Sequence, residues 1–440
     1  MAEYSHAIDL RKTKTVSKPL GIVPPEWNIC CVGSLGEIVT GQTPSTSQPA
    51  YFGGDIPFVS PTDIAGQRYI NQTQTTLTDE GAKQVRILPP NSILITCIGG
   101  LGKVGQAKNS LATNQQINSI IPNEKLDPAY GFWAAHLLKP QLDTIAGIQV
   151  LPIVNKRLFS QLLLPCPPFT EQRAIAQILD TLDTQIQQTG RLITKLKQVK
   201  AGLSRNLLAY GIDEKGNMRD PVRQSEFKSS PLGRIPREWN IDHLINHISL
   251  PSGQVDPKKP PYCHWTLIAP DHIEPATGRL LNRQTALEQN ATSGKYCFQP
   301  YDVLYSKIRP HLRKAVLVHD KGLCSADMYP LRPHSTITPY FLFATVLSED
   351  FSRFAIAVSA RSRFPKMNRQ ELTEYTFALP PYAEQVHISK LLAIQDTRLN
   401  NEEAHLNKLQ QIKKGLMHDL LTGRVRVTQL ATTLEKLEVR

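Results

Sequence analysis

Three glycines, Gly100, Gly102 and Gly105, form the pattern GxGxxG directly after an apolar run, as in sites that hold a dinucleotide phosphate. Such a site also needs a helix that opens at the loop. Here "QAKNSLATNQQINSIIP" follows, rich first in turn formers and then in strand formers. The pattern therefore predicts the tip of a β-hairpin, where bare glycines would let DNA approach the backbone closely.

The tetrapeptide "LPPY" at 379–382 is similar to the [DN]PP[YF] signature of amino-group DNA methyltransferases. That chemistry needs an Asp or Asn to accept a hydrogen bond from the exocyclic amine, and Leu379 cannot do so. The segment "PCPPF" at 165–169 holds the matching place in an internal repeat, so both segments predict strand-to-helix connections. With no HExxH, GxSxG, P-loop or paired-carboxylate signature either, we expect no catalytic residue and no metal site.

Polar and basic side chains gather in short clusters in both halves of the chain. Arg matches guanine edges, Asn and Gln match adenine edges, and Lys and Ser contact phosphates, so the clusters predict DNA contacts. Lys307, Arg309 and Arg313 have the same parity and would share one face if a strand continued past Pro310. The candidate DNA-binding residues are Thr40, Gln42, Thr43, Ser60, Thr62, Lys103, Asn114, Gln115, Gln116, Lys307, Arg309, Arg313, Lys314, Ser325, Arg361, Arg363 and Lys366. The alternative is a set of solvated loops without a ligand.

The elements that position these residues occur twice. "PLGIVPPEWN" at 19–28 recurs as "PLGRIPREWN" at 231–240, and residues 167–208 recur without a gap as 380–421. In this register Glu171–Gln172 matches Glu384–Gln385, whereas the stretches between the shared segments barely match. The chain is therefore predicted to be two copies of one plan, with shared ends and divergent middles.

The repeated tails predict two long helices, each preceded by a Pro-Pro stop. Thr170 can cap the first helix, and Glu171 suits its positive end. A narrow apolar stripe of this length indicates a coiled-coil seam between the two helices. The expected seam residues are Leu179, Leu182, Ile186, Ile193, Leu196, Leu399, Leu406, Leu409, Ile412 and Leu416. The lysines near the helix ends, Lys200 and Lys413 among them, would suit the helix dipole and solvent.

Each divergent middle repeats one layout. Strand-like runs occupy 91–100 and 118–122 in the first half, and 301–308 and 314–320 in the second. In each half an apolar helix follows, at 129–142 and 339–356, and then a short turn that Asn155 or Asn368 can cap. One scaffold with two surface chemistries suits two domains that bind different DNA sequences.

Composition and charge limit the kind of partner and the cellular compartment that we expect for this protein. The chain has 440 residues, a formal net charge of +12 and seven cysteines. The positive charge favours a polyanionic partner such as nucleic acid. The cysteines include the neighbours Cys30 and Cys31 but no CxxC spacing, which is typical of reduced thiols in the cytoplasm. We expect neither a membrane span nor an export signal, because the chain has no long apolar run and its N-terminus has no apolar core.

These patterns predict an α+β fold in which two similar globular domains are separated by two long helices. The two helices would pack against each other along their apolar stripes. The expected boundaries are 1–170 for the first globular domain, 171–210 for the first long helix, 211–230 for a linker, 231–383 for the second globular domain, 384–424 for the second long helix and 425–440 for a C-terminal tail.

Several motifs resemble the specificity subunit of type I restriction–modification enzymes. They are "TGQTPSTSQPAYFGGDIPFVSPTDI" at 40–64, "ATNQQI" at 112–117 and the repeated PPxxEQ before a helix that ends GLxxxLL. They occur in the family's order along essentially the whole chain. The second domain departs from the family's wording, with "KIRPHLRK" and "CSADMYPL" in place of the "GQTP" and "NQQI" motifs.

The resemblance implies two target recognition domains that select a bipartite, asymmetric stretch of double-stranded DNA. It implies that conserved helical spacers separate these domains and pack as an antiparallel coiled coil, which makes the internal repeat pseudo-twofold. It also implies recruitment of two methylation subunits and, through them, of restriction subunits. The chain itself would be non-catalytic and bind no cofactor, with S-adenosylmethionine, ATP and Mg on the partner subunits. The alternatives are a coiled-coil DNA-binding regulator without enzyme partners and a free-standing adenine methyltransferase or nuclease, which the missing motifs disfavour.

Overall fold

The computed structural model describes residues 23–147, 153–359 and 365–427. The chain forms two compact units. The first unit combines the chain up to Thr189 with the chain from His405 onward, and the second is Gly190–Ala404. Nowhere in these described ranges does a helix carry an apolar stretch long enough to cross a membrane.

Two sheets and a strand pair make up the β-structure of the first unit. Its strands are β1 (Asn28–Cys31), β2 (Gly36–Thr40), β3 (Phe52–Val59), β4 (Tyr69–Ile70), β5 (Thr75–Leu77), β6 (Ile93–Thr96), β7 (Val104–Ala107), β8 (Ala112–Thr113), β9 (Ile117–Pro122) and β10 (Leu163–Cys166). One sheet has the order β2-β9-β6-β7-β4, the other has the order β5-β3-β8, and β1 pairs with β10. Strands β6 and β7 are antiparallel neighbours, so "GLGKVG" does close a β-hairpin, which confirms the interpretation of this loop.

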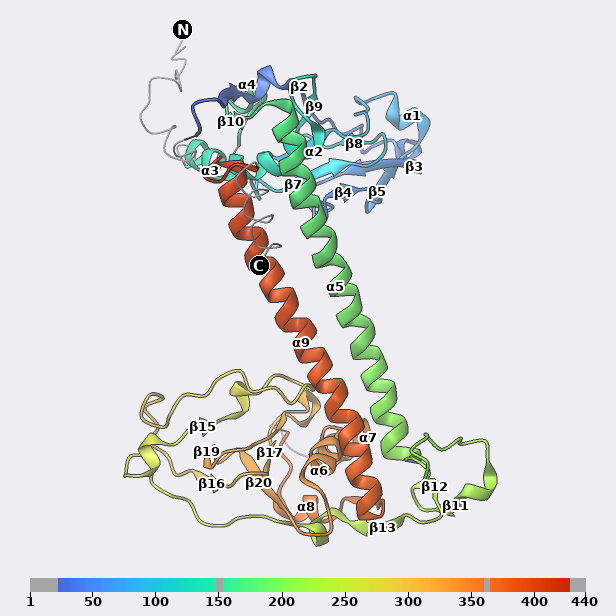
Figure 1. The fold of residues 1–440 in the computed structure, drawn as a ribbon. Helices are drawn as coiled ribbons and strands as arrows, with labels where there is room; N and C mark the ends of the chain where they lie inside the picture. Colours follow the sequence, from blue (N-terminus) through green and yellow to red (C-terminus); the bar gives the residue numbers. More distant parts are fainter. Residues whose placement is uncertain (1–22, 148–152, 360–364, 428–440) are drawn as a thin grey trace, which may run out of the picture. The chain divides into compact units, whose positions relative to one another are not determined.

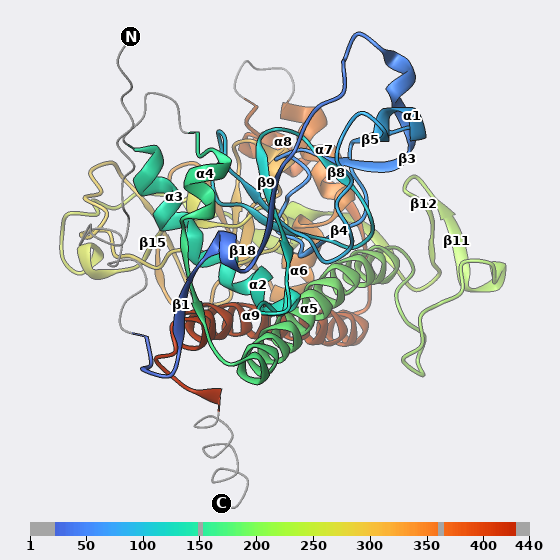
Figure 2. The same cartoon turned by 90° about the horizontal axis from the view of Figure 1, so that it is seen from above.

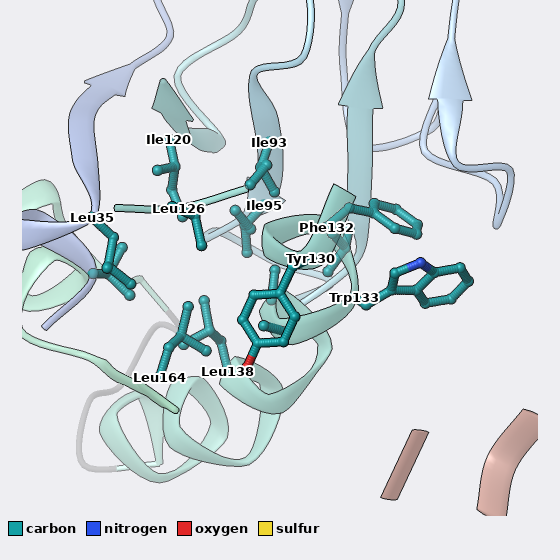
Figure 3. Packing of buried hydrophobic residues seen from close by; sticks show 14 of the residues in the cluster. Leu35, Ile93, Ile95, Ile120, Leu126, Tyr130, Phe132, Trp133, Leu138 and Leu164 are labelled. Carbon is teal, nitrogen blue, oxygen red and sulfur yellow. The ribbon is translucent and has the colours of Figure 1, made fainter. Parts of the chain in front are cut away.

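The helices of the first unit are α1 (Asp79–Ala82), α2 (Pro128–Ala134), α3 (Lys139–Ala146), α4 (Lys156–Ser160) and the first part of α5 (Phe169–Tyr210). Helices α2 to α5 pack on one face of the larger sheet, whereas α1 lies against β3 and β5 of the smaller sheet. Figure 1 shows α2 beside the first turns of α5. Ile93 of β6 and Ile120 of β9 face Tyr130 and Leu138 of the helical layer (Figure 3), whereas Leu94 packs on the opposite face. Strand β6 is therefore buried on both faces, which explains its continuous apolar run.

The second unit repeats this arrangement. Its strands are β11 (Phe227–Ser230), β12 (Gly233–Pro236), β13 (Asn240–His243), β14 (Ile248–Ser249), β15 (Leu267–Ile268), β16 (Tyr296–Phe298), β17 (Val303–Ser306), β18 (Ala315–Leu317), β19 (Gly322–Cys324), β20 (Met328–Pro333) and β21 (Thr376–Leu379). Strands β14-β20-β17-β18 form one sheet, β15-β19-β16 form another, and β13 pairs with β21. The predicted linker is not featureless, because its last residues enter the β11–β12 hairpin, drawn in light green in Figure 2.

The helices of the second unit are α6 (Pro339–Val346), α7 (Glu349–Ser359), α8 (Arg369–Thr373) and the first part of α9 (Tyr382–Leu421). The single apolar helix expected at 339–356 is thus two helices. Helix α6 ends at Val346, and the Ser348 hydroxyl accepts a hydrogen bond from the Phe351 amide at the start of α7 (3.1 Å). A serine favours such a cap over a helix interior, so it starts a new helix here. Asn155 and Asn368 cap α4 and α8, as predicted.

Helices α5 and α9 pair in an antiparallel manner within each unit. In the second unit Lys197 pairs with Glu403, whereas Lys200, farther along α5, pairs with Asp396, which lies earlier on α9. In the first unit Lys413 pairs with Asp183. The Asp183–Lys413 and Asp396–Lys200 pairs occupy matching positions of the repeat. These lysines therefore bind the opposite helix, and the expectation that they serve only the helix dipole and solvent is wrong for them.

The structure buries most of the expected seam. Leu179, Leu182, Ile193, Leu196, Leu399 and Leu409 are buried, and Ile186, Leu406 and Leu416 are half-buried. Ile412 is 41% exposed, so its assignment to the seam is wrong. The next residue, Lys413, turns inward instead, with its ammonium 4.9 Å from the ring centroid of Trp133. Thr170 does not cap α5 either, because the helix begins one residue earlier, at Phe169.

Candidate nucleic-acid interface

Two of the polar clusters of the first unit lie side by side. Thr40 ends β2 and leads into Gln42 and Thr43, while Asn114–Gln116 connects β8 to β9. The Gln42 amide donates to the Thr113 carbonyl (2.9 Å), and the Thr43 hydroxyl donates to Gln115 Oε1 (2.6 Å). The antiparallel pairing of β2 with β9 brings the two loops together, although they are far apart in the sequence.

The turn after β3 joins the same surface. Asp63 organises it by accepting hydrogen bonds from the Ser60 amide (2.8 Å) and hydroxyl (2.7 Å), and the Ser60 hydroxyl is also 2.8 Å from that of Thr62. Lys103, beside the hairpin tip, donates to the Pro61 carbonyl (3.0 Å). The Asn114 amide donates to the Val59 carbonyl (2.9 Å), which ties this turn to the β8–β9 loop. All nine candidates of the first unit are therefore brought together.

The Gln115 and Gln116 side chains of the β8–β9 loop are arranged to present hydrogen-bond donors. Asn114 Nδ2 donates to Gln116 Oε1 (3.0 Å), and Asn114 Oδ1 accepts from the Gln116 amide (3.1 Å). These bonds orient both side chains. Within the described chain, the terminal amino groups of Gln115 and Gln116 donate to no protein group, so they are available to a base edge.

Two residues of this surface are absent from the sequence-based candidates. Asn118 is buried, accepts from the Thr40 hydroxyl (2.6 Å) and donates to the Val154 carbonyl (3.1 Å). Asp63 shapes the turn that presents Ser60. Asp63 lies inside the motif at 40–64, and Asn118 directly follows the motif at 112–117, but a motif does not separate the residues that shape a loop from those that face a ligand.

The second unit builds the equivalent surface from different residues. In the first unit the Cys97 amide donates to the Gln116 carbonyl (2.7 Å), one step beyond the paired residues Thr96 and Ile117. In the second the Lys307 amide donates to the Asp327 carbonyl (3.0 Å), one step beyond Ser306 and Met328. Cys97 and Lys307 therefore occupy one place in the fold, and Gln116 and Asp327 occupy another.

Two further bonds confirm this correspondence. The Cys97 carbonyl accepts from the Val154 amide (2.9 Å), and the Lys307 carbonyl accepts from the Met367 amide (2.9 Å). Ser325 corresponds to Asn114, because its amide donates to the residue that ends β15, as the Asn114 amide does to the residue that ends β3. The loop "NQQ" of the first unit is thus "SAD" in the second.

The parity argument for the basic cluster of the second unit is wrong. Strand β17 ends at Ser306, and Pro310–Leu312 forms a 3-10 helix because proline cannot continue the ladder. Arg313 Nε donates to the Leu347 carbonyl at the end of α6 (3.0 Å), and Lys314 Nζ donates to the Pro270 carbonyl (2.7 Å). The Arg313 guanidinium is therefore engaged by the protein itself and is not brought to the surface formed by Lys307 and Asp327. Lys314 corresponds to Lys103 of the first unit, because its carbonyl accepts from the Ser306 amide as the Lys103 carbonyl accepts from the Thr96 amide, so it lies at the second surface as Lys103 does at the first.

The hairpin tips of the two units differ in one informative respect. Gly99 and Gly102 have φ values of +74°, in the left-handed region that glycine tolerates. The corresponding residues of the second unit are Arg309 and Arg313, both with φ of +49°. An L-residue in this conformation costs about 1–2 kcal/mol. The hydrogen bond from Arg313 to the Leu347 carbonyl compensates for this strain at Arg313. Arg309 is exposed, and its side chain has no partner within the described chain.

Arg313→Ala is expected to lower the free energy of unfolding of the second unit by about 1–3 kcal/mol, because the Leu347 carbonyl loses a charged hydrogen-bond donor. Base preference should not change. Chemical unfolding and selection from a randomised DNA library would measure the two effects. Arg313→Gly is the matched control, because glycine relieves the left-handed strain and should recover about 1 kcal/mol. A change of base preference with unchanged stability would contradict this role.

The remaining candidates divide between two groups. Lys366 is exposed, and its backbone forms an isolated antiparallel β-bridge with Ile308, the residue after Lys307. The Ser325 hydroxyl accepts a hydrogen bond from the Asp327 amide (3.2 Å). Both therefore belong to the second surface. Arg361 and Arg363 lie outside the described residues. In the described ranges, no group of three or more His, Cys, Asp or Glu side chains is placed to hold a metal ion.

The repeated Trp and Glu of the shared segments meet in both units. Trp27 Nε1 donates to Glu171 Oε2 (3.1 Å), and Trp239 Nε1 donates to Glu384 Oε2 (3.0 Å). An arginine from the segment that follows the opposite long helix completes each site. Arg426 bonds to Glu171 (2.8 Å and 2.9 Å), and Arg219 bonds to Glu384 (3.2 Å for Nη2). Each domain is thus closed by chain that follows the other repeat's helix.

The comparisons with known proteins agree with this repeated design. A family model described as "Type I restriction modification DNA specificity domain" matches residues 24–198 and 275–411. The "Type I restriction enzyme EcoDI specificity subunit" of Escherichia coli is 30% identical over 286 residues, which cover 59% of this chain and 62% of that protein. The "Type I restriction enzyme MjaVIII specificity subunit" of Methanocaldococcus jannaschii is 22% identical over 93% of this chain and 95% of that protein.

Solved structures show the same fold. The S subunit of the type I restriction–modification system of M. genitalium superposes with a TM-score of 0.57 at 14% identity, covering 91% of this chain and 97% of that one. A chain from a structure of a type I R-M system gives a TM-score of 0.55 at 15% identity, covering 92% of this chain and all of that one.

Proposed function

Because the chain belongs to the type I restriction–modification DNA specificity family, we propose that it selects a bipartite, asymmetric sequence in double-stranded DNA. Each recognition domain would bind one half-site. The correspondence between the Asn114–Gln116 and Ser325–Asp327 loops carries this proposal, because equivalent loops expose different hydrogen-bonding groups. Amide side chains suit adenine edges, whereas charged groups suit a G·C pair, so the two half-sites would differ.

The chain would contribute binding and no catalysis. The net charge of +12 attracts the phosphate backbone independently of sequence, and the exposed Arg309 and Lys366 are suited to phosphate contacts. S-adenosylmethionine, ATP and Mg would be bound by partner subunits. Because it would bind the DNA of the host, we place the protein in the cytoplasm.

Two methylation subunits would bind at surfaces that the repeat duplicates. Phe169 and Tyr382 hold matching positions at the starts of α5 and α9, and they are 45% and 52% exposed. Val199 and Ile412 match in the same register and are also exposed. An apolar side chain exposed at both positions of a repeat favours a partner that binds twice. Restriction subunits would join through the methylation subunits.

The test uses the full-length chain and a library of duplexes in which two randomised half-sites are separated by a variable gap. We expect selection of two half-sites together and affinity that falls steeply with salt. Exchanging residues 29–154 for the corresponding domain of a relative should replace one half-site and leave the other unchanged. A simultaneous change of both half-sites would contradict separate reading by the two domains.

A second measurement concerns the partners. Co-expression with a methylation subunit from the same organism should yield a complex in which the selected sequence becomes methylated. Sequence-specific binding without such a complex would instead support a DNA-binding regulator that acts alone. Loss of the complex on Phe169→Glu and Tyr382→Glu, with DNA binding retained, would support the duplicated docking surfaces.

A further inference from the structure

Lys307 and Asp327 stand opposite each other where β17 ends and β20 begins. The hydrogen bond between the Lys307 amide and the Asp327 carbonyl (3.0 Å) continues the ladder past Ser306 and Met328. Opposite residues of an antiparallel pair direct their side chains to the same face, with Cβ atoms about 5 Å apart. One cation and one carboxylate are therefore presented side by side by rigid backbone.

The Lys307 side chain is held in place although it has no anionic partner. It is only 8% exposed, and its ammonium lies 5.0 Å from the ring centroid of Tyr329. Within the described chain it forms no ion pair and donates no side-chain hydrogen bond. Burial lowers the pKa of Lys307, and the neighbouring Lys366 and Arg369 lower it further, while Asp327 opposes them. The surroundings are thus positive and attract an acceptor.

The Asp327 backbone is also held in place, and its carboxylate also lacks a partner within the described residues. The Ser325 hydroxyl accepts from its amide (3.2 Å), and Gln116 occupies the corresponding position in the first unit. Its carboxylate accepts no hydrogen bond within the described residues. A bare carboxylate is repelled by DNA phosphates and is stabilised there only if a base amino group donates to it. Exposed lysines such as Lys366 need no such preparation to bind a phosphate.

We propose that Lys307 and Asp327 together read one G·C base pair in the second half-site. Lys307 donates to guanine O6 or N7, and Asp327 accepts from the cytosine N4 amino group. These are the acceptors and the donor that a G·C pair displays in the major groove, and no other pair displays them in this order. The inference rests on the proposed function and assigns the base chemistry of one of its two surfaces.

The experiment compares the full-length wild type, Lys307→Met and Asp327→Ala in selection from the bipartite library. Methionine keeps the apolar contact with Tyr329 and removes the charge. We expect both variants to lose preference at one and the same G·C position by about tenfold or more, since a good base contact discriminates by about 1–3 kcal/mol. The other positions of the second half-site, and the whole first half-site, should keep their preference, which also shows that the variants are folded.

Two variants of matched charge serve as controls. Lys366→Met removes an exposed cation next to Lys307 and should weaken binding to all sequences equally, with a shallower salt dependence. Asp320→Ala removes an exposed carboxylate on the loop after β18 and should change nothing. The inference is overturned if Lys307→Met behaves like Lys366→Met, or if the two test variants affect different positions or an A·T pair. Absence of any bipartite selection by the wild type would instead contradict the proposed function.

Discussion

Glu384→Gln should lower the free energy of unfolding of the second unit by about 3–5 kcal/mol, the cost of breaking a buried ion pair from one side. The Arg219 and Glu384 side chains are only 8% and 9% exposed. Glu384 also accepts from Trp239 Nε1 and from the Ile212 amide (2.9 Å). Glutamine keeps the shape but leaves the buried Arg219 guanidinium with only the exposed Glu238 carboxylate, 3.4 Å away, as its counter-charge.

The repeat supplies the matched comparison for this variant. Glu171→Gln removes the equivalent carboxylate, but its partner Arg426 is 26% exposed and can be solvated in part. The first unit should therefore lose less, about 1.5–3 kcal/mol. Hydrogen exchange resolved by peptide distinguishes the two units, and Glu374→Gln, at an exposed position, controls for a lost surface charge. Equal losses at Glu171 and Glu384 would contradict the burial argument.

Gln385→Leu should destabilise the second unit by about 2–5 kcal/mol. Gln385 Oε1 accepts from the Thr338 amide (2.9 Å), and Nε2 donates to the Thr336 (3.1 Å) and Pro380 (3.0 Å) carbonyls. Leucine fills a similar volume but leaves the Thr338 amide and the Pro380 carbonyl buried and unpaired, at about 1–3 kcal/mol each, while the partly buried Thr336 carbonyl can bond to water. The measurement is chemical unfolding, followed by the fluorescence of Trp239 and Trp265 with the other tryptophans replaced by phenylalanine.

Gln172→Leu provides the parallel measurement in the first unit. Gln172 bonds to the Asp127 amide (2.9 Å) and to the Lys125 and Pro167 carbonyls (3.0 Å each), a nearly identical set. Both glutamines are 1% exposed, so here the two losses should be equal. A large inequality, or a loss below about 1 kcal/mol in either unit, would show that water replaces the lost bonds.

Much of the architecture could be predicted because it depends on local patterns. The gapless repeat of 167–208 and 380–421 predicted α5 and α9, and their narrow apolar stripe predicted the pairing. The glycines of "GLGKVG" predicted a hairpin tip, and Asn155 and Asn368 marked the starts of α4 and α8. Periodicity, caps and turn residues act over a few positions, so they can be read from the chain itself.

The errors have a common origin in partners that are distant in sequence. Ile412 fits the apolar stripe of the sequence, but Lys413 points inward instead, because its ammonium forms an ion pair with Asp183 and lies over the Trp133 ring. The sequence around Arg313 predicts a contact with a DNA base, but in the structure its guanidinium donates a hydrogen bond to the Leu347 carbonyl. A side chain's role follows from what lies beside it, and neither neighbour is near in the sequence.

By itself, the sequence determined that the chain is a duplicated α+β protein with paired helices and two divergent, polar domains suited to DNA. Only the tertiary structure decided that "NQQ" at 114–116 and "SAD" at 325–327 occupy the same place, since the middles share no residues that could be aligned. The correspondence exists in the backbone hydrogen bonds of β6 with β9 and of β17 with β20. Strand pairing depends on backbone groups that every residue carries, so the fold persists while the side chains at its reading edge diverge.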